Sequence, residues 1–252
     1  MLDKTLKKPA LDAAQVLERN NLLNLLPVDD FERLAPHLES VWMVQGEVIF
    51  ESGDLLNYVY FPLTCTISMV SVMENGSLFE IALIGNEGIV DNTYLNVETY
   101  LPKVVVVRSA GYAFRLPIHL LDTEFNRTGG RRKGTLHQLL LRYSQLLIIQ
   151  MAQTALCNRN HSIEQQFCRW LLISIDKQAS NELNFTQESI AEMMGVRREA
   201  ITISAIKLYK KGLVDYHRGN IRILNRLGLE ERACNCYHLV KSESEKLFQN
   251  LS

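Results

Sequence analysis

The chain has 252 residues, of which 47% are apolar and 22% are charged. This length has room for two modest domains, and this composition argues against extensive disorder. No run of 18 apolar residues occurs, and the N-terminus lacks an apolar segment followed by a cleavage site, so we expect a cytoplasmic protein that does not enter a membrane.

Charge is divided unevenly between the two halves, although the net charge is only -1. Residues 1–130 contain 9 Lys/Arg and 17 Asp/Glu, a net charge of -8, whereas residues 131–252 contain 18 and 11, a net charge of +7. We therefore expect any surface that binds a polyanion to lie in the C-terminal half. The five cysteines are odd in number and scattered, which predicts reduced thiols.

The first half of the chain changes from short helices to strands. Apolar spacing predicts helices over residues 11–26 and from the acidic turn at Asp29 to Leu38. From Val41 to Phe114, β-rich runs separated by glycines at intervals of about 8 to 12 residues are typical of sandwiches and barrels. Asn75-Gly76 predicts a tight hairpin turn. The expected strands cover residues 41–44, 47–50, 58–61, 66–73, 78–83 and 103–116.

Residues 131–158 have the pattern of one long helix. They contain no proline, and their single glycine is Gly134. Mostly apolar residues at steps of four or three predict a coiled-coil-like seam, whereas Leu141 and Ile148 add apolar surface on other faces. A helix buried against both its own β domain and a second copy of the chain fits this pattern, the alternative being the central helix of a monomer. The predicted dimer seam consists of Leu136, Leu140, Tyr143, Leu147, Met151 and Thr154.

A further helix is expected over residues 162–175, and the next segment has the pattern of a helix-turn-helix. Thr186 is a suitable N-cap for a short helix that ends at the turn residue Gly195. Ile201, Ala205 and Leu208 are spaced to form the inner face of a second helix. Short helix, glycine turn and longer helix together match the DNA-binding form of this motif.

The outward residues of the second helix favour contact with DNA. Arg198 and Glu199 are placed to reach base edges, and Ile203 could touch a thymine methyl group. An alternating segment over residues 212–224 predicts a hairpin, or wing. Residues 197–222 hold seven basic and two acidic residues, a net charge of +5. The predicted DNA-binding residues are Thr186, Gln187, Arg197, Arg198, Glu199, Thr202, Ile203, Lys207, Lys210 and Arg218, with Arg197, Lys207, Lys210 and Arg218 at or near phosphates.

This order of a glycine-punctuated β domain, a long helix and a winged helix-turn-helix resembles the CRP/FNR family of bacterial transcription regulators. The resemblance rests most on residues 185–224 and on Gly46, Gly53, Gly76 and Gly85. It implies an α+β protein with an N-terminal jelly-roll (double-stranded β-helix) sensor domain that resembles cyclic-nucleotide-binding domains. It also implies dimerisation through the long helix and a homodimer that reads a two-fold-related operator.

The effector segment departs from the members that bind cyclic AMP. Where those members carry Gly-Glu-Leu and, some ten residues later, Arg-Ser, this chain has residues 85–93 and then Leu101-Pro102-Lys103. A lysine lacks the bidentate fork of arginine, and Pro102 has no backbone donor, so binding of cyclic AMP is disfavoured. Arg108-Ser109 supplies the dipeptide, but within the following strand run. An effector pocket, if present, is predicted at Gly85, Asn86, Asp91, Asn92 and Lys103.

No cofactor, metal site or enzymatic activity is predicted. An iron-sulfur cluster of the FNR type needs N-terminal cysteines, and this chain has none before Cys65. Cys234, Cys236 and His238 resemble metal ligands, but the second pair of ligands that zinc sites normally show is missing from the sequence around them. A C-terminal helix over residues 229–251 is the preferred interpretation. No nucleotide-binding or hydrolase motif occurs.

These observations predict three parts: a β roll over residues 1–130, a dimerisation helix over residues 131–158, and a winged helix-turn-helix over residues 159–252. The predicted function is that of a homodimeric transcription regulator that binds double-stranded DNA and senses an unidentified signal, with RNA polymerase as an expected partner. The alternative is a ligand-sensing or protein-interaction module whose helix-turn-helix no longer reads DNA. Ile203, in place of a base-contacting arginine, favours that alternative.

Overall fold

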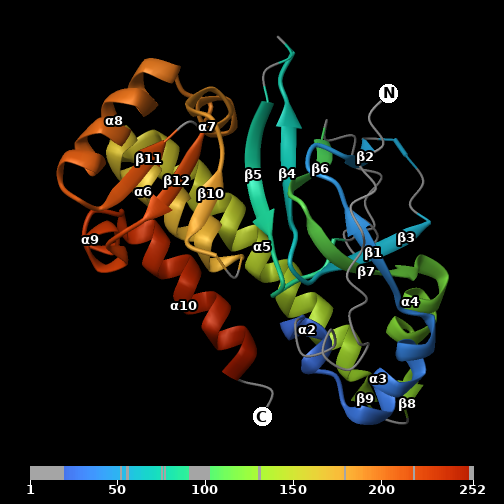
Figure 1. The fold of residues 1–252 in the computed structure, drawn as a ribbon. Helices are drawn as coiled ribbons and strands as arrows, with labels where there is room; N and C mark the ends of the chain where they lie inside the picture. Colours follow the sequence, from blue (N-terminus) through green and yellow to red (C-terminus); the bar gives the residue numbers. More distant parts are fainter. Residues whose placement is uncertain are drawn as a thin grey trace, which may run out of the picture.

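The computed structural model contains an N-terminal β domain and a C-terminal helical domain, with one long helix running between them (Figure 1). The residues that it describes are 20–51, 53–54, 57–74, 76, 78–90, 103–129, 132–178, 180–217 and 219–249.

Short helices open the described chain. They are α2 (Asn21–Asn24), α3 (Val28–Leu34) and the 3-10 helix η1 (Ala35–His37). Asn20 caps α2, because its side chain accepts a hydrogen bond from Leu23 N, and its amide donates to Pro62 O and Gly88 O at 2.9 and 3.0 Å. This buried asparagine therefore ties the helices to the β domain. The helix predicted over residues 11–26 lies partly outside the described residues.

Two antiparallel sheets face each other and form the β roll (Figure 1). One sheet has the order β1-β7-β3, with β1 at Glu39–Met43, β7 at Gly111–Pro117 and β3 at Tyr58–Pro62. The other has the order β2-β6-β4-β5, with β2 at Val48–Glu51, β6 at Lys103–Ser109, β4 at Thr66–Val72 and β5 at Leu78–Ile84. Val59, Phe61, Ile67, Val105 and Leu116 are fully buried, as expected for the inner faces of packed sheets.

One predicted strand is in fact two. The run over residues 103–116 breaks at Ala110, so that β6 pairs with β4 in one sheet and β7 pairs with β3 in the other. The chain passes close to itself at this corner, since a Cβ on Gly111 would lie 2.5 Å from Cys65 N. Continuous β propensity marks both strands but does not show where the chain changes sheets.

Helix α4 (Ile118–Phe125) and the short strands β8 (Thr128–Gly129) and β9 (Arg132–Lys133) lead into the long helix α5 (Thr135–Asn160). Three residues of the predicted dimer seam on α5 are corrected by the structure, because Leu136, Leu140 and Tyr143 are at most 2% exposed within one chain, whereas Leu147, Met151 and Thr154 are half-buried. They pack into the core of the β roll, and Leu147 and Met151 pack against the same core. The large apolar residues that α5 leaves exposed are Leu141, Ile148 and Leu156.

The C-terminal domain has its own hydrophobic core. Its elements are α6 (Ile163–Asp176), β10 (Glu182–Asn184), α7 (Gln187–Met194), α8 (Arg198–Lys210), β11 (Val214–His217), β12 (Asn220–Ile223), α9 (Arg226–Glu230) and α10 (Asn235–Gln249). The single helix predicted over residues 229–251 is divided into α9 and α10, and α10 runs back beside α5 (Figure 1). Among the described residues, none of the helices combines the length and the hydrophobicity that a membrane span requires.

Candidate DNA-binding interface

Helices α7 and α8 form the predicted helix-turn-helix. Thr186 caps α7, since its side chain accepts a hydrogen bond from Ser189 N at 3.1 Å. Gly195 ends α7 in the left-handed conformation, with φ 64°, which only glycine adopts at little cost. The predicted inner faces are confirmed, because Ile190, Ala191 and Met194 on α7 and Ile201, Ala205 and Leu208 on α8 are all buried.

The N-terminal half of α8 presents what we call the reading face, made of Arg197, Arg198, Glu199, Thr202 and Ile203. Arg197, Arg198 and Glu199 are exposed, and Ile203 is 56% exposed. Arg198 lies 3.3 Å from the carboxylate of Glu188 on α7, and both side chains are largely in solvent. An exposed ion pair of this kind contributes at most about 1 kcal/mol, so Arg198 remains available to a ligand.

Two of the predicted DNA contacts also bind other side chains of the C-terminal domain. The Thr202 hydroxyl donates to Gln187 Oε1 at 2.6 Å, which links α8 to α7. Lys207 is exposed and lies 3.5 Å from the carboxylate of Glu164 on α6, whereas Lys210 is exposed at the end of α8. The predicted phosphate contact Arg218 lies outside the described residues.

Strands β11 and β12 form the predicted wing beside α8. They pair antiparallel from Val214 with Ile223 to His217 with Asn220, and Gly219 turns the chain with φ 82°. Strand β10 adds a third strand on the other side of β12. The alternating sequence that predicted the hairpin corresponds to alternating burial along β12, since Ile221 and Ile223 are buried and Arg222 between them is exposed.

Two exposed apolar side chains on α8 escaped the sequence prediction. Ile206 is 48% exposed and Tyr209 is 58% exposed, at three-residue steps from Ile203. The helical period indicates their exposure, because positions 206 and 209 lie on a different side of α8 from the buried Ile201, Ala205 and Leu208. The outward side of α8 therefore carries an apolar stripe beside its charges.

The β roll contacts the helix-turn-helix through a polar junction, which we define as Glu80, Arg108, Trp170 and Phe185. Arg108 and Glu80 form a buried ion pair at 2.9 Å. The Arg108 guanidinium also lies 4.7 Å from the ring centroid of Trp170 and 4.2 Å from that of Phe185. Burial lowers the pKa of Arg108, and the carboxylate of Glu80 opposes this effect. An arginine of the β roll is thus packed against two aromatic rings of the C-terminal core.

The turn of the helix-turn-helix also contacts strand β5. A Cβ on Gly195 would lie 2.9 Å from the ring of Phe79. The strand that carries Glu80 therefore reaches the turn between α7 and α8. Sequence patterns could not reveal this contact, because the residues are more than a hundred positions apart.

The segment predicted as an effector pocket is packed by other parts of the same chain. A Cβ on Gly88 would lie 2.0 Å from Tyr143 Oη, and a Cβ on Gly85 would lie 2.6 Å from Lys177 O. Glu87 is 6% exposed and forms an ion pair with Lys177. Asn86 is half-buried. Asp91 and Asn92 lie outside the described residues, and Lys103 is described only as the first residue of β6, so the pocket stays a prediction.

Comparisons with known proteins agree with this geometry. Residues 165–232 match the family model of the Crp-like helix-turn-helix domain. No curated protein sequence matches the chain.

Similar solved structures cover most of the chain. A transcriptional regulator of the CRP/FNR family from Eubacterium rectale has 15% sequence identity and a TM-score of 0.64, covering 84% of this chain and 96% of that one. FixK2 from Bradyrhizobium japonicum has 11% identity and a TM-score of 0.63, covering 78% and 98%. The c-di-GMP responsive regulator CLP from Xanthomonas campestris has 15% identity and a TM-score of 0.57, covering 78% and 99%.

The predicted fold class and the predicted resemblance are confirmed by these findings. The chain carries a Crp-like helix-turn-helix domain at residues 165–232 and has the overall fold of the CRP/FNR transcription regulators.

Proposed function

We propose that the chain regulates transcription by binding double-stranded DNA as a homodimer through the reading face of α8. The observation that carries this proposal is the exposure of Arg197, Arg198 and Glu199 at the N-terminal end of the second helix of a helix-turn-helix. A recognition helix contacts base edges with these positions. The net charge of +5 over residues 197–222 supplies attraction to phosphates.

Each side chain has a role in this proposal. Arg198 forks onto a guanine and Glu199 accepts a hydrogen bond from cytosine N4, while Ile203 touches a thymine methyl group. Arg197, Lys207, Lys210 and Arg218 contact phosphates, which positions the protein without reading sequence. Thr186 and Gln187, at the start of α7, lie beside the backbone of the DNA, where the first helix of such a motif crosses it.

The dimer contact that we propose lies on the exposed side of α5. Leu141, Ile148, Ala152 and Leu156 follow one another at steps of seven, four and four residues, and all four are exposed. Such spacing places them on one side of a helix, where a second copy of α5 would cover them. This face replaces the predicted seam, of which Leu136, Leu140 and Tyr143 lie in the core.

A charge in this face tests the dimer. Ile148→Asp should convert the dimer into monomers, because an aspartate would be buried without a partner between two helices. The control is Val28→Asp, since Val28 is 69% exposed on α3 and outside the proposed face. Sedimentation of both variants decides the point, and a dimeric Ile148→Asp protein would contradict the proposed contact.

The β roll is proposed to sense a signal and to pass it to the helix-turn-helix through the junction. The buried Arg108 and the contact between Phe79 and Gly195 support this route, because a shift of β5 or β6 would move groups packed against α6 and α7. CLP is described as responsive to c-di-GMP, so one protein with a similar fold has a small-molecule effector. RNA polymerase remains an expected partner of the DNA-bound dimer.

The exposed apolar stripe of α8 favours a second candidate, in which the helix-turn-helix binds a protein. Ile203, Ile206 and Tyr209 expose about half of their surfaces, as contact residues of a protein interface would. Electrophoretic shifts over genomic fragments separate the two candidates. We expect shifts that weaken steeply as salt is raised, since binding to phosphates releases counterions. No salt-dependent shift at any fragment would contradict DNA binding.

A further inference from the structure

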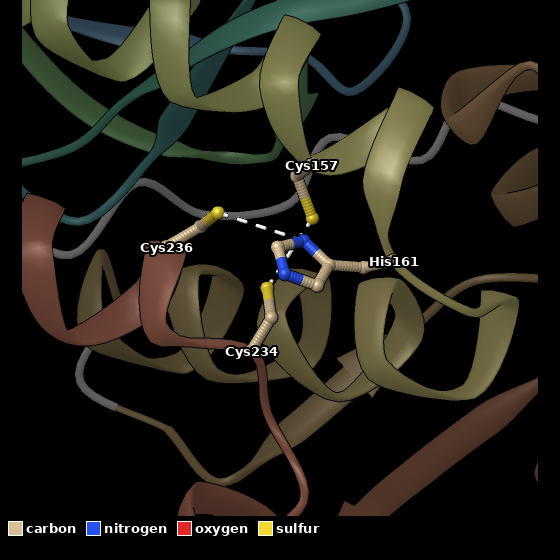
Figure 2. Close-up of side chains that lie close together, drawn as sticks. All are labelled: Cys157, His161, Cys234 and Cys236. Atoms are coloured by element: carbon tan, nitrogen blue, oxygen red, sulfur yellow. Dashed lines mark hydrogen bonds between the residues drawn. The ribbon is translucent and has the colours of Figure 1, made fainter.

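Three cysteines and one histidine from distant parts of the chain meet where α5 ends and α10 begins. They are Cys157, His161, Cys234 and Cys236, and Figure 2 shows their side chains pointing toward one another. Their potential ligand atoms all lie within 4.8 Å of one another. We propose that these four residues bind one zinc ion.

The distances suit a mononuclear tetrahedral site. Cys157 Sγ lies 3.3 Å from Cys234 Sγ, and Cys236 Sγ lies 3.7 Å from His161 Nδ1 (Figure 2). With zinc-sulfur bonds of about 2.3 Å, two thiolates at a tetrahedral angle are about 3.8 Å apart. The four ligand atoms therefore need only small movements to hold one ion.

The set of donor atoms selects zinc among common metals. Three thiolates and one imidazole form a known structural zinc site, whereas magnesium and calcium require oxygen ligands. An iron-sulfur cluster would separate its protein ligands by the width of the cluster, which is hard to reconcile with ligand atoms this close together. Copper(I) also accepts thiolates, so the metal content of the protein has to be measured.

The surroundings differ from those of ordinary core cysteines. Cys157, Cys234 and Cys236 are at most 7% exposed, and they form a cluster of their own, apart from the two large apolar cores. Arg169 is 7% exposed nearby, and its Nε has no hydrogen-bond acceptor among the described residues. Its positive charge acts on Cys157 and Cys236. A zinc ion with three thiolates and a neutral histidine carries a net charge of -1, which this guanidinium offsets.

The structure supplies the second pair of ligands that the sequence around Cys234 lacks. Cys157 and His161 lie four residues apart at the end of α5, and a pair with this helical spacing faces one way. His238, the neighbour expected from sequence, is exposed and lies outside the group. The sequence alone does not reveal this group, because Cys157 and Cys234 are 77 positions apart along the chain.

The ion would hold together the segments that meet where the long helix joins the C-terminal domain. His161 is the C-cap of α5, and only Ser162 separates it from α6. Cys234 and Cys236 lie at the start of α10, which packs on α5. Zinc would therefore fix the start of α10 to the end of α5. The site does not depend on the proposed binding of DNA, because it involves no residue of the reading face.

Metal analysis of the full-length protein, purified under reducing conditions, tests the proposal. We expect one zinc per chain by mass spectrometry. Replacing zinc with Co²⁺ should give the intense visible absorption of a tetrahedral site together with thiolate charge-transfer bands. Cys236→Ser and His161→Gln should each weaken zinc binding by at least about tenfold in competition with a chromophoric chelator, given that changes even beyond the ligands cost that much.

Two matched variants serve as controls. Cys65→Ala removes a buried thiol in the β roll, and His238→Gln removes the histidine next to the cluster, so both should bind zinc as tightly as the unmodified protein. If Cys236→Ser fails to fold, the cobalt spectrum of the unmodified protein decides, and a spectrum without tetrahedral and thiolate bands contradicts the proposal.

Other results would also overturn it. They are metal-free protein that takes up neither zinc nor cobalt, stoichiometric iron or copper in place of zinc, a disulfide between Cys157 and Cys234 in the reduced preparation, and equal zinc affinity in all four variants. DNA binding is measured separately, so a failure of one proposal does not imply a failure of the other.

Discussion

The reading face of α8 and the junction between the β roll and the helix-turn-helix differ in the exposure of their ion pairs. On the reading face, Arg198 and its partner Glu188 are 63% and 72% exposed. At the junction, Arg108 and Glu80 are 3% and 9% exposed. Exposed charges cost little to the folded state and are free to bind a ligand, whereas buried charges depend on each other. We therefore expect variants at the junction to change stability and variants on the reading face to change binding.

The largest expected effect is at the junction. Arg108→Met should lower the free energy of unfolding by about 3 to 5 kcal/mol, because it leaves the carboxylate of Glu80 buried without its cation. The double variant Arg108→Met, Glu80→Leu should recover much of this loss, since both charges are then absent. Urea unfolding measures both values.

A matched surface pair is the control for the junction. Arg115 and Glu39 form an ion pair whose side chains are 36% and 54% exposed, so Arg115→Met should cost no more than about 1 kcal/mol. If Arg108→Met and Arg115→Met lowered the free energy of unfolding equally, burial of the Arg108–Glu80 ion pair would not increase its contribution to stability.

An intermediate effect is expected on the reading face. Arg198→Ala should weaken binding to the preferred DNA site by about 1 to 3 kcal/mol and relax the preference for one base pair in each half-site. Its unfolding free energy should stay within about 0.5 kcal/mol of the original, because the side chain is exposed. Fluorescence anisotropy with matched and mismatched duplexes measures the binding. A loss equal for all sequences would assign Arg198 to phosphate contact instead.

The smallest effect is expected at the end of α8. Lys210→Ala should weaken binding to all sequences to a similar extent and reduce the dependence of log affinity on log salt by about one. Titrations at several salt concentrations measure this slope. An unchanged slope would mean that Lys210 does not contact a phosphate.

Local patterns predicted the parts of the molecule that local chemistry determines. Helix α7 begins at the capping hydroxyl of Thr186 and ends at the left-handed Gly195. The buried Ile201 and Leu208 orient α8. These features depend on neighbours within a few residues, so a single sequence contains them. The scaffold of the helix-turn-helix and its wing was accordingly predictable, as was the exposure of the reading face.

Contacts between distant residues were not predictable in the same way. Periodicity showed that α5 has buried faces but not what covers each of them, so Leu136 and Tyr143 were assigned to a second chain although they pack on the β roll. Arg108 belongs in the sequence to a strand run, and its contacts with Trp170 and Phe185 join residues more than 60 positions apart. Burial of a polar residue becomes visible only when the chain is folded.

Selection of bound sequences from random DNA duplexes tests the central claim most directly. The unmodified protein and Arg198→Ala are carried through the same selection at moderate salt. We predict that the unmodified protein enriches a site with two related half-sites in opposite orientation, and that Arg198→Ala loses the preference at one position of each half-site. Enrichment of no sequence by the unmodified protein, or of the same site with the same preferences by both proteins, would contradict the assignment of the α8 reading face to DNA.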